Sequence, residues 1–288
     1  RHRLTKKTPN AKVSEAVEPI VYYLDPGIPE PVLGALLDGA SWWNKAFSDI
    51  GYKNAFQVKI LPKGADPMDV RYNVIQWVHR ATRGWSYGSS VVDPRTGEIL
   101  KGHVTLGSLR VRQDYLIALG LTSPFKNDSN GQSTNTDTQI NMALARIRQL
   151  SAHEVGHTLG IAHNFATSEY GRESVMDQIS LQGAYATGMG AWDDYVVAYG
   201  YQNYPNQQEE AKGLDTLVRK ARASGMGYQS DPDARPLHAA NPSGSLWDEG
   251  SDAVAELKRI GEIRKIALSQ FGINSIPSGS TLSSLEER

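Results

Sequence analysis

The segment between residues 153 and 163 constrains this chain more than any other part of its sequence. It reads H-E-x-x-H-x-x-G-x-x-H. On an α-helix, residues four apart lie about 40° from each other, so His153 and His157 can reach one ion with bonds of about 2.0–2.1 Å. Gly160 tolerates the left-handed conformation that ends a helix, after which the chain can offer His163 from another direction. Three imidazoles and one open position are typical of a catalytic zinc site, so we predict one zinc ion per chain.

The glutamate inside this motif predicts chemistry beyond metal binding. Glu154 follows the first histidine and points around the helix, where it is poorly placed as a ligand but can reach a water on the metal. A carboxylate there suits a general base, which takes a proton from the attacking water and delivers it to the departing amine. A purely structural zinc site needs no such group. We therefore predict a hydrolase in which Glu154 is the catalytic residue and zinc-bound water attacks the amide.

A second motif, Ser174-Val175-Met176-Asp177, comes shortly after the third histidine. The two motifs together resemble those of the metzincin metallopeptidases, in which a methionine turn lies beneath the zinc ligands. The resemblance implies that Met176 forms an apolar floor under the histidines without binding the metal. The wider run over residues 153–177 resembles a family of large bacterial zinc-dependent metalloproteases. So do three later segments, Trp192-Asp193, Tyr199-Gly200-Tyr201 and Leu246-Trp247-Asp248.

Three polar residues near the motifs are candidates for holding the site in place. Asn164 follows the third histidine, where its amide can steady the loop or simply end the helix. Ser174 opens the methionine turn. Asp177 closes that turn and can either bond locally or accept a hydrogen bond from a ligand histidine.

The side chain that stabilises the oxyanion is left open by the sequence. Several metzincin groups carry a tyrosine two places after the methionine of the turn, and a phenol there can bond the developing oxyanion. Gln178 occupies that place here, and an amide donates more weakly. The weak candidates for contacts to the oxyanion or substrate are therefore Gln178, Tyr170 and Tyr185.

The order of expected elements indicates an α+β fold. Apolar patterning predicts strands over 20–24, 56–61 and 70–78, and a hairpin around the turn at 93–97 that continues through 103–106. Helices are expected from Pro29 to Phe47, over 138–160, and then over 192–199, 207–223 and 251–271, with loops over 127–138 and 224–245. This order suits a metzincin-like zincin, with a mixed twisted sheet and zinc helix in the N-terminal part and a mainly helical C-terminal part after the methionine turn.

The same patterning suggests where the parts of the chain begin and end. We expect an N-terminal extension over 1–16 and a catalytic domain over 17–200, with its upper part at 17–160 and its lower part at 161–200. A helical C-terminal part of that domain follows over 201–274. The tail over 275–288 is expected to fray or to lead to another domain.

Composition excludes several classes of function. The 288 residues carry a formal net charge of −1, which gives no electrostatic basis for binding nucleic acid or an anionic membrane. No apolar run approaches the roughly 20 residues that span a bilayer. The chain has no cysteine, which excludes disulfides and thiolate metal ligands. It starts with a basic segment and without methionine, so we expect it to be part of a longer polypeptide. The family resemblance implies export from a bacterial cell, by a signal outside this chain.

The resemblance also implies a zinc-dependent endopeptidase whose peptide or protein substrate lies extended along an edge strand. Two segments are candidates for that strand, Ser86–Val92 and Gly102–Leu106. Two alternatives stay open from the sequence. One is a catalytically latent, zinc-containing binding module, and the other is a zinc amidase that acts on a non-protein amide of the cell wall. The motif cannot separate these, because the metal and the base serve any amide.

Overall fold

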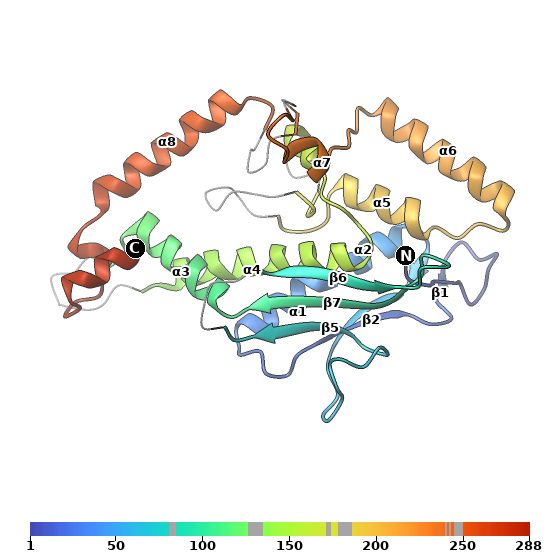
Figure 1. The fold of residues 1–288 in the computed structure, drawn as a ribbon, viewed down its shortest axis with the longest axis horizontal. Helices are drawn as coiled ribbons and strands as arrows, with labels where there is room; N and C mark the ends of the chain where they lie inside the picture. Colours follow the sequence, from blue (N-terminus) through green and yellow to red (C-terminus); the bar gives the residue numbers. More distant parts are fainter. Residues whose placement is uncertain are drawn as a thin grey trace.

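The structure of the chain is a computed structural model. A five-stranded mixed sheet forms its base (Figure 1). The structure describes residues 1–80, 85–125, 135–170, 174–177, 186–239, 241, 243–244 and 250–288. The strands are β2 (Ile20–Leu24), β4 (Phe56–Ile60), β5 (Asn73–Val78), β6 (Tyr87–Val92) and β7 (Ile99–Gly107). They lie in the order β4-β2-β5-β7-β6. The first four in this order are parallel to one another, and β6 pairs with β7 in the antiparallel direction at one edge.

Residues in the expected N-terminal extension, 1–16, contact the body of the structure. The terminal amine of Arg1 donates to the carbonyl oxygen of Gly97 over 3.0 Å. His2 is buried, and its ring bonds the hydroxyl of Tyr22 on β2. A second, two-stranded sheet then joins β1 (Ser14–Glu15) to β3 (Tyr52–Lys53) in parallel.

Two helices replace the single helix expected between Pro29 and Phe47. They are α1 (Val32–Ser41) and α2 (Trp43–Asp49). The break comes at Trp42, whose N–H bonds the carbonyl of Gly39 in a turn tighter than that of an α-helix. The next residue, Trp43, is fully buried, and its indole N–H donates over 2.8 Å to the carbonyl of Ala152 on the long helix described next.

The long helix α4 (Asp137–Thr158) carries the first two histidines of the motif and packs between the sheet and the C-terminal part (Figure 1). Beside it lies α3 (Leu109–Thr122), which the apolar pattern does not predict. Its buried residues include Asp114, so a polar side chain occupies a position that a helical pattern would assign to an apolar one. The helix is held in part by burial of Ala118 and Leu119.

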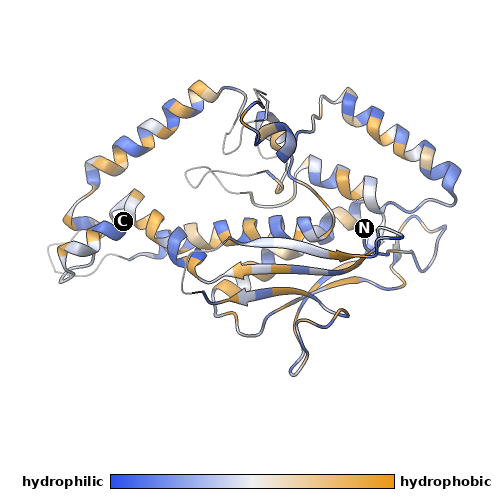
Figure 2. Cartoon of the chain, viewed as in Figure 1, coloured by the Kyte–Doolittle hydropathy of each residue, from blue (hydrophilic) through white to orange (hydrophobic). Residues whose placement is uncertain are grey.

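The C-terminal part is helical, as expected, and lies on the other side of α4 from β5 and β7 (Figure 1). Its helices are α5 (Ala191–Tyr201), α6 (Gln207–Ala223), α7 (Asp231–Ala234) and α8 (Ala253–Gln270). The 3₁₀ helices of the structure are η1 (Phe165–Tyr170), which precedes α5, and η2 (Ile273–Ser275) and η3 (Leu282–Glu287), which follow α8. Helix α7 falls within residues 224–245, which were expected to be a loop. Both α6 and α8 mix hydrophilic and hydrophobic residues along their length (Figure 2).

The end of the chain returns to α3 (Figure 1). Arg112 on α3 bonds the carboxylate of Glu287 over 3.0 Å. The guanidinium of Arg288 bonds the carbonyl of Ser275 over 3.1 Å. These contacts join residues at the end of the chain to α3 and to Ser275. Among the described helices, none is both long and apolar enough to cross a bilayer.

Aromatic side chains fill the core between the sheet and its helices. Tyr22 stacks on Phe56 with 5.4 Å between ring centroids, and Phe47 stacks on the same Phe56 at 5.8 Å. All three side chains are buried. Tyr22 also donates its hydroxyl over 2.8 Å to the hydroxyl of Thr158, the last residue of α4. The core therefore fixes the end of the helix from which the chain turns toward the third histidine.

The close packing of α1 on α4 can be tested by substitution of Gly39. A Cβ at Gly39 would overlap the backbone of Arg148, closer than real Cβ contacts come. We expect Gly39→Ala to lower the free energy of unfolding by about 1–3 kcal/mol, because the two helices must separate. Gly34→Ala on the same helix is the control. Its Cβ would meet only the end of the Glu30 side chain, so the change should leave stability equal or raise it by up to about 1 kcal/mol. Urea unfolding of the two variants measures this, and equal effects would contradict the packing described.

Candidate metal centre

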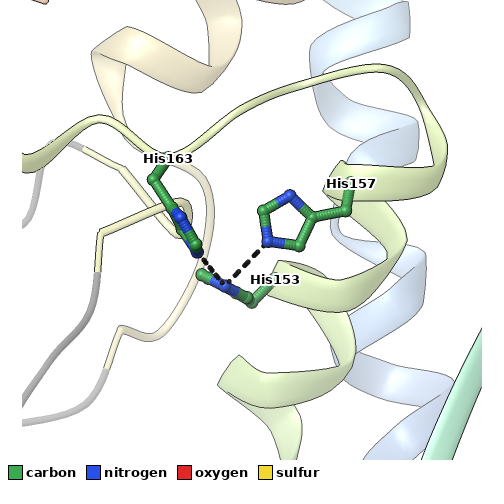
Figure 3. Close-up of side chains that lie close together, drawn as sticks. All are labelled: His153, His157 and His163. Atoms are coloured by element: carbon green, nitrogen blue, oxygen red, sulfur yellow. Dashed lines mark hydrogen bonds between the residues drawn. The ribbon is translucent and has the colours of Figure 1, made fainter. Parts of the chain in front are cut away.

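Helix α4 and the turn after it bring the three motif histidines together (Figure 3). His153 and His157 project from the last turns of the helix. Gly160 follows with a φ of +93°, in the left-handed region that the sequence predicted for it. The chain reverses there and returns His163 toward the other two rings.

The distances between the rings fit one small cation. The Nε2 atom of His153 lies 3.2 Å from that of His157 and 3.3 Å from that of His163. One nitrogen from each of the three rings lies within 4.8 Å of the other two. Zinc–nitrogen bonds of about 2.0–2.1 Å at tetrahedral angles separate the nitrogens by about 3.3 Å. The geometry therefore matches the spacing that a zinc ion requires.

The opposite ring nitrogens show which atoms are free to bind a metal. Nδ1 of His153 donates to the carbonyl of Val175 over 2.7 Å, and Nδ1 of His157 donates to the carbonyl of Ile161 over 2.9 Å. Nδ1 of His163 bonds the carboxylate of Asp231 over 2.7 Å. Because these acceptors keep the proton on each Nδ1, three Nε2 lone pairs face one another. Lone pairs at this separation repel unless a cation lies between them, so the residues fit a metal ion.

The protonation of the first two histidines is consistent with metal binding. Burial, together with the charges of the neighbouring histidines, holds the pKa of His153 well below its usual range. Burial also lowers the pKa of His157. Both rings are thus neutral at neutral pH, and a metal does not have to displace a proton from them.

Asp231 is a functional residue that sequence reasoning did not assign to the site. Its carboxylate forms an ion pair with Arg235 and also bonds His163. Although partial burial opposes it, the hydrogen bonds from His163 and Arg235 hold the pKa of Asp231 below its usual value. The carboxylate therefore stays charged and orients the third ligand.

Glu154 lies in a buried position beside the histidines. Burial raises the pKa of its carboxyl to about 7, while the backbone N–H of Gly88 acts in the opposite direction. Gly88 belongs to β6, and a Cβ there would overlap the backbone oxygen of Glu154. The absence of a side chain at Gly88 lets the edge strand reach the helix at the glutamate.

Met176 packs against the helix that carries the first two motif histidines, next to Gly156. Its side chain is fully buried. A Cβ at Gly156 would overlap the sulfur of Met176 and the ring of Trp43, so the helix, the methionine and the tryptophan are in close contact. Gly156 stands between the two helical histidines, which places the methionine on the side of the helix beneath them.

Two buried polar side chains hold the methionine turn in place. Ser174 donates to Asp193 over 2.7 Å and accepts from the N–H of Met176 over 2.9 Å. Asp193, at the start of α5, also accepts from the N–H of Val175 over 2.9 Å. Burial raises the pKa of Asp193 to about 6, in spite of these hydrogen bonds. The role of Asp193 was not predicted, because nothing in the local sequence connects it to the turn.

Asn164 ties the loop after the third histidine to the C-terminal part. Its amide donates to the carbonyl of Gly227 over 2.9 Å, and its carbonyl oxygen accepts from the N–H of Gln229 over 3.0 Å. Its own N–H reaches the carbonyl of Met176 at 3.4 Å. Of the two readings of Asn164, these contacts favour the one in which its amide steadies the loop.

The remaining candidates lie beside the site or outside the described residues. Asp177 accepts from the hydroxyl of Ser168 over 2.9 Å, whereas the Nδ1 atoms of the three histidines bond other acceptors. Gln178 and Tyr185 fall outside the described residues. The backbone of Tyr170 ends η1, and its side chain is also outside the described part. The oxyanion-stabilising side chain stays unassigned.

Comparison with known protein families agrees with the geometry. A family model described as Met-zincin matches residues 135–288, more than half of the chain. The chain belongs to this Met-zincin family. Comparisons with curated proteins and with solved structures each found no match. The matched region of this Met-zincin starts just before α4 and continues to the last residue, so it includes the metal centre, the methionine turn and the C-terminal helices. It confirms the predicted α+β zincin fold.

The hydrogen bond from Asp231 to His163 should contribute to metal affinity. We expect Asp231→Ala to weaken zinc binding about 10- to 100-fold, because the third imidazole loses the acceptor that orients it. Asp233→Ala is the matched control, since Asp233 lies on the same short helix and bonds the N–H of Ser230 instead. Competition with a zinc-binding dye measures both affinities. If Asp231→Ala binds zinc as tightly as the unchanged protein, this role for the carboxylate is wrong.

Proposed function

We propose that this Met-zincin is a zinc-dependent endopeptidase that hydrolyses peptide bonds. The observation that carries the proposal is the placement of Glu154, a buried carboxyl next to three imidazoles whose Nε2 atoms converge. A site that only holds a metal for stability needs no buried acid beside it. Burying a carboxyl without such a role would only cost stability.

Glu154 performs the proton transfers in this proposal. A zinc ion on the three imidazoles would supply Lewis acidity, polarising the carbonyl and lowering the pKa of a water from about 15.7 toward about 7. The carboxylate of Glu154 accepts a proton from the attacking water and then donates it to the nitrogen of the departing amine. Burial of Glu154 raises its pKa toward neutrality, and a general acid–base group works best with its pKa near the working pH.

The edge strand β6 supports a peptide as the substrate. Its neighbour β7 is an inner strand, so Gly102–Leu106 offers no free edge and that alternative is wrong. Residues 86–92 include β6, whose outer edge is not paired within the five-stranded sheet. A peptide that added to this edge would lie next to Glu154, because Gly88 brings the strand against the helix there.

Exchange of the glutamate for its amide tests the proposal. We expect Glu154→Gln to keep one zinc per chain and to lose about 10²- to 10⁴-fold in kcat, because the amide cannot accept the proton. The control is Glu262→Gln on α8, where an exposed glutamate pairs with Lys265. Cleavage of a mixed peptide library, followed by mass spectrometry with and without a chelator, measures the activity.

Three results would count against the proposal. Full activity of Glu154→Gln would remove the general-base role. Peptide cleavage that survives complete removal of the metal would remove the metal from the reaction. Zinc binding with no cleavage of any peptide, and release of fragments from purified cell wall instead, would favour an amidase that acts on a non-protein amide.

A further inference from the structure

Two arginines line a cavity that opens beside the catalytic glutamate. The cavity has a volume of about 130 Å³, and its walls include Glu154, His153, Arg110 and Arg146. At about 30 Å³ per molecule, this is room for roughly four waters, or for one short side chain in their place. Neither the general-base reaction nor metal binding requires an arginine here.

The two arginines come from different helices and are held in place. Arg146 lies on α4, seven residues before His153, so it is on the same face of the helix and about 10 Å further along its axis. It is buried, with 7% of its surface exposed. Arg110 stands near the start of α3, and its side chain bonds Asp114 over 3.3 Å. Asp114 is itself buried and fixes the direction of this guanidinium.

Charged side chains of both signs surround the cavity. Arg110 and Arg146 both lie in its wall. Burial raises the pKa of Asp114, and the charges of Arg110 and then Arg146 act against that rise. Among the described residues, the carboxylates that line the cavity wall are Glu154 and Asp177, and Asp114 lies beside Arg110.

We propose that this cavity binds a carboxylate of the substrate, from an Asp or Glu side chain that flanks the scissile bond or from the C-terminus of the peptide. This inference rests on the proposed peptidase function and names its substrate class. A guanidinium presents a planar set of N–H donors that matches a carboxylate with two parallel hydrogen bonds. The cavity places these donors next to Glu154, the general base for the attacking water, so the bound carboxylate would lie close to the cleaved bond.

A purely structural role for the arginines makes a different prediction. In that case Arg110 and Arg146 would only balance the charges of Asp114 and Glu154, and the substrate would not contact them. Peptides that differ only in charge at positions near the cleaved bond would then be hydrolysed at similar rates. The preference for a carboxylate therefore separates the two roles without any change to the protein.

Matched peptides test the inference on the zinc-loaded chain. Each pair carries Glu or Gln, or Asp or Asn, at one position on either side of the cleaved bond, and a further pair has a free or an amidated C-terminus. We expect one position to show a preference for the acid of about 10- to 100-fold in kcat/KM, as a charged hydrogen bond in a buried site gives. A preference confined to the free C-terminus would identify the terminal carboxylate as the group that is bound.

Variants then connect the preference to the two arginines. We expect Arg146→Gln and Arg110→Gln to reduce the ratio of acidic to amide peptide cleavage to about twofold or less. The controls are Arg148→Gln and Arg112→Gln, each two residues further along the same helix. These arginines bond Asp38 and Glu287 outside the cavity, so their exchange should leave the ratio unchanged. Zinc content and urea unfolding of each variant show whether it is folded.

Each outcome decides the inference. Peptide cleavage without any preference for an acid, or a preference that survives both arginine exchanges, overturns it while the peptidase proposal stands. If no peptide is cleaved, the peptidase proposal fails, and binding of the same peptide pairs to the zinc-loaded chain is measured by fluorescence anisotropy. Tighter binding of the acidic member that is lost in Arg146→Gln supports the cavity, and equal binding of both members overturns it.

Discussion

The convergence of three Nε2 lone pairs is the constraint on which the site depends, and three hydrogen bonds on the far side of the rings maintain it. The acceptors come from separate segments: Val175 in the methionine turn, Ile161 after the zinc helix, and Asp231 in α7. The metal centre can therefore form only when these segments are folded onto α4. All three segments lie within residues 135–288, which the family model matches. Helix α7 of the C-terminal part therefore contributes a residue to the site.

The parts that local geometry determines were predictable from the sequence. The spacing of His153, His157 and His163 fixes a helix, a turn and a metal, because each depends on only a few consecutive residues. The order of most strands and helices followed from apolar patterning, whereas the expectation for Met176 came from the family resemblance. Asp231 was not, because it meets His163 across 68 residues of sequence. Asp193 was missed for the same reason, since its partners lie in a turn that precedes it by 18 and 19 residues.

Elements that depend on tertiary packing also escaped prediction. Helix α3 carries a buried Asp114 where an apolar residue would have shown the helical period. The N-terminal residues look like a polar extension, yet His2 is buried against Tyr22. His2 bonds Tyr22, which lies 20 residues away in the sequence, whereas Asp114 pairs with Arg110 one turn earlier on the same helix. The division at Trp42 likewise follows from contacts with α4, since Trp43 bonds a carbonyl of that helix.

The central claim is that three imidazoles bind one zinc ion, and X-ray absorption spectroscopy at the zinc edge tests it most directly. The purified chain would be loaded with zinc, dialysed, and assayed for metal content before the spectrum is taken. The account predicts one zinc per chain with three imidazole nitrogens at about 2.0 Å and one further light ligand. Loss of zinc on dialysis, or a spectrum with fewer than three imidazoles, would contradict the account.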